Sequence, residues 1–373
     1  MNFLTQIAGT AIVILALLDV FFTVLFPASG HGPVRKPLSW AVWCIFRVIG
    51  TITAGERRRN FLSYSGPVLF AVTSTVWFVL LVIGWAMIYK PALGTAITAS
   101  SGTTDTSWAM AIYYSGFNLT TLGVGDVTAN TGLYRLLTIT EAAAGFAFFS
   151  LVITYFLSVY SEITSRNAFA QGLHHLTGKT GNAAELLVRL ADDPDLSTVK
   201  QHLSSKADFL RQMYQTNRFY PVLRYFHYRE PCYALPRILL IALDTATLLR
   251  SGLDKDRYAR LMHSPSLDDL FESAMCLIQE LSGNAPQRKS PPAALEAWRK
   301  HYHATAARLS QVGVAVRSDL DAGASEYIAA RIQWDPSIHV LAEIMLYEWE
   351  SIEQPPAPKP GSDRARGVWS GRD

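Results

Sequence analysis

The sequence is poor in charged residues and in cysteine. Only 17% of its 373 residues are charged while half are hydrophobic, a balance that is unusual in a water-soluble protein. The three cysteines, at 44, 232 and 276, are too far apart for a disulfide framework or a metal-ligand cluster, so we expect each to be a small buried side chain. A net charge of +3 is too small to indicate nucleic-acid binding. These features favour a membrane protein.

The motifs of several enzyme and receptor classes are also missing. The Gly-Lys-Thr sequence at 178–180 is not a phosphate-binding loop, because Leu173 stands where such a loop needs its first glycine. No G-x-G-x-x-G sequence follows a strand, which argues against a dinucleotide-binding regulatory domain. The histidines at 174 and 175, and at 301 and 303, lack the helical spacing of a metal site. No apolar segment carries an arginine at every third position, as a voltage sensor would.

Long apolar runs are abundant, and all of them precede residue 165. Residues 3–26, 67–89 and 133–163 are each long enough for a helix to cross a hydrocarbon layer of ~30 Å. The first run has no basic residue before it and is too long for the core of a cleaved signal peptide, so we expect it to remain as a spanning helix. The sequence therefore predicts three transmembrane helices.

Positive charges give the expected orientation. Between the first two runs lie six cations, whereas Lys90 is the only one between the second and third; the six are Arg35, Lys36, Arg47, Arg57, Arg58 and Arg59. Lysine and arginine in short loops mark the cytoplasmic side. We therefore expect residues 27–66 inside, the loop before residue 133 outside, and everything after about residue 165 in the cytoplasm. The expected location is the plasma membrane (the bacterial inner membrane), as a multi-pass protein.

Residues 37–54 allow two interpretations. This run is apolar but short, and it contains Arg47. It could be a fourth span, which would place the N-terminus inside. It could also be a helix in the cytoplasmic interface with Trp40 and Trp43 at headgroup depth, and the flanking cations favour this second interpretation.

The loop between the second and third spans has an unusual composition. Ser107 is suited to cap a short helix that runs to Thr120, too short to cross a bilayer. The chain must then return outward, and non-helical backbone at membrane depth is tolerated only where it is buried in protein or lines a water-filled cavity. Gly123 and Gly125 permit backbone angles that could align successive carbonyl oxygens. Four such columns around one axis would replace the water shell of a cation.

These residues resemble the pore of the tetrameric potassium channel family. That family has an aromatic pair on a pore helix and then Thr-Thr-Val-Gly-Tyr-Gly-Asp. Here the pair is Tyr113-Tyr114 and the following sequence, at 120–126, is Thr-Thr-Leu-Gly-Val-Gly-Asp. The order outer helix, pore helix, filter and inner helix also matches, over about residues 60–165. The resemblance implies a homotetramer with one filter segment per chain, K⁺ as the permeant ion and no cofactor.

The resemblance also assigns roles to single residues. Ion sites would be formed by main-chain oxygens and by the Thr121 hydroxyl. The filter residues would be Thr121, Leu122, Gly123, Val124 and Gly125, with K⁺ bound at the first four. Thr120, Tyr113 and Tyr114 would support the filter, and Asp126 would ring the outer mouth.

Two positions depart from the family pattern. Val124 stands where the family has a tyrosine whose hydroxyl ties the filter to the pore helix, and Phe117 stands where some relatives keep an acid behind the filter. Asp126 is therefore expected to lack that partner, and filter stiffness would come from apolar packing. A channel with weak potassium preference is the resulting alternative.

The third apolar run contains candidate gating residues. Gly145 lies about where the family has its bending glycine, with close helix packing as the alternative. Phe149, Ile153 and Leu157 follow at a spacing of four and could form an apolar gate. Two acids lie inside apolar runs: Glu141 could hydrogen-bond behind the filter, and Asp19 could meet Arg47 or the arginines at 57–59.

The second half of the chain is helical in pattern, with apolar residues three and four apart in six segments (181–193, 197–215, 236–252, 266–283, 291–313 and 336–351). The expected domains are an N-terminal spanning and interfacial part (1–60), a pore domain (61–166), an all-α cytoplasmic domain (167–352) and a disordered tail (353–373). The aromatic-rich segment 224–233 is expected to be a packed loop, or else a ligand pocket or a contact to the pore.

The sequence thus predicts an all-α membrane protein that is a potassium-selective channel and not an enzyme, gated or assembled by its cytoplasmic domain. Its expected partners are further copies of itself, the lipid bilayer and an unidentified cytoplasmic ligand, and not nucleic acid. Two alternatives remain open: a weakly selective monovalent cation channel, and a membrane-tethered cytoplasmic sensor with a vestigial pore.

Overall fold

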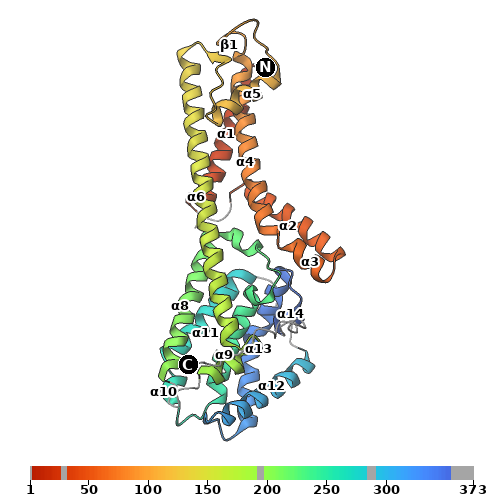
Figure 1. The fold of residues 1–373 in the computed structure, drawn as a ribbon, viewed down its shortest axis with the longest axis vertical. Helices are drawn as coiled ribbons and strands as arrows, with labels where there is room; N and C mark the ends of the chain where they lie inside the picture. Colours follow the sequence, from red (N-terminus) through yellow and green to blue (C-terminus); the bar gives the residue numbers. More distant parts are fainter. Residues whose placement is uncertain (1, 27–31, 191–196, 284–290, 354–373) are drawn as a thin grey trace, which may run out of the picture. The chain divides into compact units, whose positions relative to one another are not determined.

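The computed structural model describes residues 2–26, 32–190, 197–283 and 291–353, and most of them are helical (Figure 1). The chain divides into two compact units. The first unit, called here the membrane unit, contains Met1–Ser165 and Gln215–Arg229. The second, called the helical unit, contains Arg166–Tyr214 and the residues from Glu230 onward. Each unit is described by itself.

The membrane unit contains six α-helices in its described part. They are α1 (Asn2–Val20), which continues as a π-helical turn to Leu25, α2 (Arg35–Ile52), α3 (Gly55–Leu62), α4 (Ser65–Tyr89), α5 (Trp108–Leu119) and the first part of α6 (Gly132–Leu176). Three stretches are long and apolar enough to cross a membrane: Phe3–Leu25, Gly55–Ala92 and Gly132–Leu176. The prediction of three spans with an extra N-terminal helix is confirmed to that extent, and α2 is not among them.

Helices α1, α4 and α6 run side by side (Figure 1). Helices α1 and α4 approach closely, since a Cβ added at Gly9 would lie 2.5 Å from the Gly84 carbonyl oxygen. Small residues at such a crossing let two backbones pack directly, which is a major source of helix association in lipid. Gln6 adds polar contacts, since its Nε2 donates to the Ile88 carbonyl at 3.2 Å and to the Tyr134 hydroxyl at 3.0 Å. The N-terminal helix is therefore an integral part of the bundle.

A small sheet closes the end of the bundle near α5, and sequence patterns did not predict it. Strand β1 (Ile97–Ala99) pairs antiparallel with β2 (Val127–Ala129), with Thr98 opposite Thr128. The strands are only three residues long, too short for an alternating pattern to be visible in the sequence. Their pairing joins the loop after α4 to the segment directly after Asp126.

The aromatic-rich segment 224–233 packs partly against the membrane unit. The 3₁₀ turn η4 (Pro221–Tyr225) lies at the start of α4, where the Ser65 hydroxyl donates to the Tyr225 carbonyl at 2.6 Å. The ring of Phe226 fills the space beside Gly66, so that a Cβ there would lie 2.5 Å from the ring. Tyr225 and Phe226 thus pack against α4 of the membrane unit, which agrees with a packed segment and with the alternative of a contact to the pore-bearing half.

The helical unit surrounds one buried helix, α9 (Leu235–Gly252), of which nearly every side chain is buried. The other elements are α7 (Ala183–Leu190), α8 (Ser197–Phe219), η5 (Pro231–Tyr233), α10 (Ala259–Met262), α11 (Pro265–Ser282), α12 (Pro292–Gln311), α13 (Leu320–Ile344) and α14 (Trp349–Glu353). Helix α13 contacts α9, α11 and α12. This confirms an all-α unit, and the six helical patterns of the sequence all fall on helices.

Two expectations for this half are wrong in detail. The pattern predicted a helix that begins at Pro336, but α13 begins at Leu320 and runs through that proline. Proline inside a helix removes one backbone hydrogen bond, and the buried Tyr327 and Trp334 hold the helix in the core on the preceding turns. Cys276 is exposed, and Cys44 and Cys232 are only half-buried, so none of the three cysteines is fully buried, contrary to the expectation. Of the tail predicted at 353–373, all but Glu353 lies outside the described residues.

A buried ion network connects three helices of the helical unit. Asp244 of α9 accepts hydrogen bonds from Tyr327 at 2.5 Å, Arg331 at 3.3 Å and His301 at 3.1 Å. Arg331 also donates to Asp335 at 3.0 Å. Burial acts to raise the pKa of the Asp244 carboxyl, but the charges of Arg331 and His301 hold that pKa below its usual value. This network stabilises the packing of α9 against α12 and α13.

Candidate functional site

Helix α5 is the short helix expected before the filter. The Ser107 hydroxyl oxygen accepts a hydrogen bond from the Met110 amide at 3.2 Å, which confirms Ser107 as the N-cap. The helix ends at Leu119, and the Thr120 hydroxyl donates back to the Gly116 carbonyl at 2.8 Å. With 12 residues, α5 extends about 18 Å at 1.5 Å per residue, so it cannot cross a bilayer.

The segment after α5 has an alternating backbone. Thr121, Gly123 and Gly125 have φ values of +58°, +60° and +80°, whereas Leu122 and Val124 between them do not have positive φ. Alternation of left- and right-handed conformations allows successive carbonyl oxygens to line one side of the backbone, as an ion filter requires. A Cβ added at Gly123 would meet nothing within 4 Å. Within one chain, glycine is therefore needed at this position for its positive φ and not for lack of space.

Thr121 is under backbone strain. A β-branched residue at positive φ is an outlier, and such strain is concentrated at functional sites, where surrounding contacts maintain it. Here the next amides bond back to the pore helix, since the Thr121 amide donates to Asn118 at 2.9 Å and the Leu122 amide to Phe117 at 2.8 Å. The end of α5 therefore holds the first part of the segment in place.

Asp126, at the outer end of the segment, has two anchors that sequence reasoning did not find. The Tyr113 hydroxyl donates to the Asp126 carboxylate at 3.1 Å. The Ser100 amide and hydroxyl donate to the Asp126 backbone carbonyl at 2.8 and 3.0 Å. Asp126 lacks the acid partner that some relatives keep at the position of Phe117, as expected, and Tyr113 of α5 bonds to it instead. Ser100 was not predictable because it joins Asp126 through the short sheet.

Behind the segment, the pore helix is tied to α6. Tyr114 and Thr138 are joined by their hydroxyl oxygens at 2.9 Å, and the Ser115 hydroxyl donates to Glu141 at 2.6 Å. Glu141 is fully buried. The expected hydrogen bond of Glu141 on the pore-helix side is thus present.

Gly145 is the closest contact between α6 and the pore helix. A Cβ at this position would lie 1.9 Å from the Leu119 carbonyl oxygen. This is the close-packing alternative to the hinge, and α6 continues as one helix through Gly145. The hinge itself stays a prediction.

The predicted filter and gate residues lie on an uncovered face of the chain. Leu122 is 72% exposed, Val124 is about half exposed, and on α6 Ile153 and Leu157 are 59% and 60% exposed. Phe149 is more covered, because its ring packs 6.0 Å from that of Phe78. Apolar residues on the opposite face of α6 are buried against the chain itself; they are Phe148, Tyr155 and Val159.

Asp19 does not meet the cations expected for it. Its carboxylate accepts hydrogen bonds from the Trp77 indole at 2.6 Å and from the backbone amides of Val34 and Arg35 at 2.7 and 3.3 Å. Amides at the start of a helix carry partial positive charge, so a buried carboxylate is well stabilised there. The expected pairing with Arg47 or with the arginines at 57–59 is wrong.

Comparison with known proteins bears on this part of the chain. Residues 69–162 match the model of a family described as ion channel. The uncharacterized membrane protein YdjJ of Bacillus subtilis (strain 168) is 29% identical over 259 residues, which cover 69% of this chain and 73% of that protein. This alignment is longer than the segment matched by the family, so the similarity extends beyond the pore. No solved structure was found to match. Residues 69–162 are therefore similar to the ion channel family, and the chain is a membrane protein with three helices long and apolar enough to cross a membrane.

Proposed function

We propose that the protein is a potassium-selective channel in which four copies of the chain surround one pore. K⁺ would bind main-chain oxygens of Thr121, Leu122, Gly123 and Val124 and move passively down its gradient, without a catalysed reaction. The observation that carries the proposal is the alternation of φ from Thr121 to Gly125 next to the short helix α5. Aligned carbonyl oxygens of this kind can replace the hydration shell of a cation.

A fourfold arrangement is supported by what one chain leaves uncovered. A single column of oxygens cannot surround an ion, and both Leu122 of the segment and Ile153 of α6 are apolar and exposed. Contiguous exposed apolar surface indicates burial against lipid or another chain. We propose that three further copies cover the filter side of α6, and that lipid covers the outer side of the bundle.

The proposed orientation of the chain in the membrane is argued from the distribution of positive charge. The cations between the first two spans favour a cytoplasmic position for that loop, and the two spans that follow it would return the chain to the same side, where the helical unit would then lie. We propose the plasma membrane as location, with the helical unit as the part that assembles or gates the tetramer. Its ligand is not assigned.

Weak potassium preference is the second candidate, and one observation favours it. Val124 cannot make the hydroxyl contact that the family's filter tyrosine makes. The Tyr113–Asp126 bond holds only the outer end of the segment. A filter that is held at fewer points can admit cations of other sizes.

Flux through the purified full-length protein in liposomes tests both candidates. We expect a K⁺ gradient to drive uptake of a tracer cation, and a bi-ionic potential close to that of a K⁺-selective membrane. A potential near zero with equal K⁺ and Na⁺ would favour the weakly selective channel. Absence of flux for either ion from a protein that is correctly folded in the membrane would refute conduction.

Two matched glycine variants make the test specific. Gly123→Ala places a side chain at a φ of +60°, which costs an L-residue about 1–2 kcal/mol in each chain. We expect it to lose selective flux. Gly132→Ala changes a glycine that has no positive φ and no neighbour within 4 Å, so flux should be retained. Equal flux in both variants would show that the filter backbone does not determine conduction.

A further inference from the structure

Helix α2 has an apolar face that no described residue covers. Trp40 is 70% exposed and Ile52 is 80% exposed. Large apolar side chains lie along this face over the whole helix: Trp40, Ile45, Val48, Ile49 and Ile52. The opposite face is packed against other parts of the membrane unit, and its residues Ser39, Phe46 and Gly50 are buried. The helix is therefore apolar on two sides, and only one of them is used within the chain.

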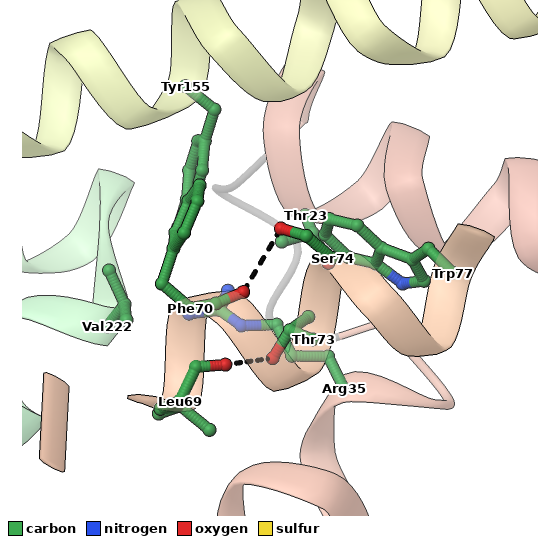
Figure 2. A pocket seen from close by; sticks show the side chains of 9 residues that line it. All are labelled: Thr23, Arg35, Leu69, Phe70, Thr73, Ser74, Trp77, Tyr155 and Val222. Carbon is green, nitrogen blue, oxygen red and sulfur yellow. Dashed lines mark hydrogen bonds between the residues drawn. The ribbon is translucent and has the colours of Figure 1, made fainter. Parts of the chain in front are cut away.

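The start of α2 is fixed at one end of the spanning helices. The amides of Val34 and Arg35 bond to Asp19 near the end of α1. The Arg35 side chain is buried and lines a small pocket with residues of α4 and α6, among them Thr73 and Tyr155 (Figure 2). Farther along, Trp43 packs against Tyr225 with ring centroids 5.3 Å apart. This half of α2 cannot leave that end of the bundle without breaking these contacts.

The second half of α2 is held against α3. The rings of Phe46 and Phe61 are stacked with centroids 4.7 Å apart, and a Cβ added at Gly50 would lie 3.3 Å from Leu62. Helix α3 contains one acid and three consecutive arginines in eight residues (Gly-Glu-Arg-Arg-Arg-Asn-Phe-Leu), a sequence that cannot lie in hydrocarbon. Since α2 lies against it, both helices are at the level of the aqueous interface. This packing favours the interfacial position over the fourth span that the sequence left open.

Cations border the apolar face. Lys36 and Arg47 are both exposed and are eleven residues apart, which places them on one side of a helix with 3.6 residues per turn. Arg57 on α3 is exposed as well. A helix with an apolar face, cations beside it and tryptophan at the boundary is suited to lie in the headgroup region of a bilayer. A second copy of the chain would match the apolar face but would leave these cations without an opposite charge.

We propose that the α2–α3 hairpin lies on the cytoplasmic surface of the bilayer and binds the headgroups of anionic phospholipids. The apolar side chains enter the acyl boundary, and Lys36, Arg47 and Arg57 contact lipid phosphates. The surface is continuous with the spans, since α2 follows α1 and α3 precedes α4. The proposal does not depend on ion conduction, so it can fail or hold whichever ion the pore carries.

Depth in the membrane is the first test, on full-length protein in vesicles of phosphatidylcholine and phosphatidylglycerol. A polarity-sensitive fluorophore is attached at Trp40→Cys or, separately, Ile52→Cys, after the three native cysteines are changed to serine. We expect nitroxide lipids labelled near the headgroup to quench both sites more strongly than lipids labelled at the chain end. The matched control is Lys300→Cys on α12, an exposed site that should not be quenched.

Lipid class is the second test. Quenching at Ile52→Cys is compared for nitroxide-labelled phosphatidylglycerol and phosphatidylcholine. We expect preference for phosphatidylglycerol, and a loss of about fivefold per cation removed in Lys36→Gln and Arg47→Gln. Arg299→Gln with Lys300→Gln on α12 should change nothing. Stronger quenching by lipids labelled at the chain end would show that α2 spans the bilayer, and absence of quenching would show that it lies in protein or water. Equal quenching by both lipid classes would show that there is no site for anionic lipid. Each of these results would overturn the proposal.

Discussion

Replacing Gly145 with alanine would push a methyl group against the end of the pore helix. The added Cβ would lie 1.9 Å from the Leu119 carbonyl oxygen, whereas ordinary contact begins at 3.4 Å. The obstacle is backbone, which cannot rotate away as a flexible side chain can. Either α6 moves away from α5, or the last turn of α5 shifts.

The size of the effect follows from two opposing contributions. Overpacking of this kind costs typically 1–3 kcal/mol. Alanine recovers up to about 1 kcal/mol because it is the better helix former. We expect a net loss of about 1–2 kcal/mol, which changes the folded-to-unfolded ratio by roughly 5- to 30-fold.

A second glycine of the same helix provides the control. Gly172 lies in α6 with nothing within 4 Å of an added Cβ. Gly172→Ala should therefore gain helix propensity without a clash, and the two variants should change stability in opposite directions. The stability of both variants is measured as the midpoint temperature of thermal unfolding of the detergent-solubilised full-length protein. Ion flux is measured in liposomes.

The result also separates packing from a hinge. Close packing predicts that Gly145→Ala lowers the midpoint and reduces conduction, because the Leu119 carbonyl directly precedes the filter segment. A hinge predicts an unchanged midpoint with altered opening. If Gly145→Ala is as stable as Gly172→Ala, the close contact has no energetic role and the reasoning is wrong.

Three further predictions concern hydrogen bonds of single residues. Tyr113→Phe removes the donor to Asp126, and we expect a fall in K⁺ over Na⁺ selectivity in bi-ionic potentials with little change in total flux; unchanged selectivity would show that the bond is not needed. Asp244→Asn removes one of the buried carboxylates that Arg331 contacts, while Asp335 remains, and should destabilise the helical unit by about 1.5–3 kcal/mol in denaturant titration. Because the pKa of Asp244 is depressed in the folded state, its contribution is present above the unfolded value of about 3.9 and is lost as pH falls through the lower folded value. The wild type should therefore lose stability in acid below about pH 4, and the loss should be smaller in Asp244→Asn.

The local sequence was sufficient to predict those features that depend on the residues of a single helix or loop. The apolar runs predicted the three spans, because the length and hydropathy of a single helix decide whether it can cross a bilayer. Ser107 predicted the start of α5, because a cap involves only its own first turn. The glycines at 123 and 125 indicated the special backbone of the filter segment for the same reason.

Contacts between distant segments were decided only by the tertiary structure. Asp19 was matched with cations on sequence grounds, yet its partners are Trp77 and the first amides of α2, which no spacing rule brings together. Ser100 reaches Asp126 only because two three-residue strands pair. The packing of α2 on α3 through Phe46 and Phe61 was likewise visible only in the tertiary structure.

The sequence by itself thus determined which segments enter the membrane and where the backbone leaves the helix, since both depend on neighbouring residues. The tertiary structure decided what holds those segments. The buried acids Asp19, Glu141 and Asp244 each find their partners more than a dozen residues away along the chain. A buried polar group must be satisfied by whatever the fold brings to it, and that is a property of packing which no local pattern records.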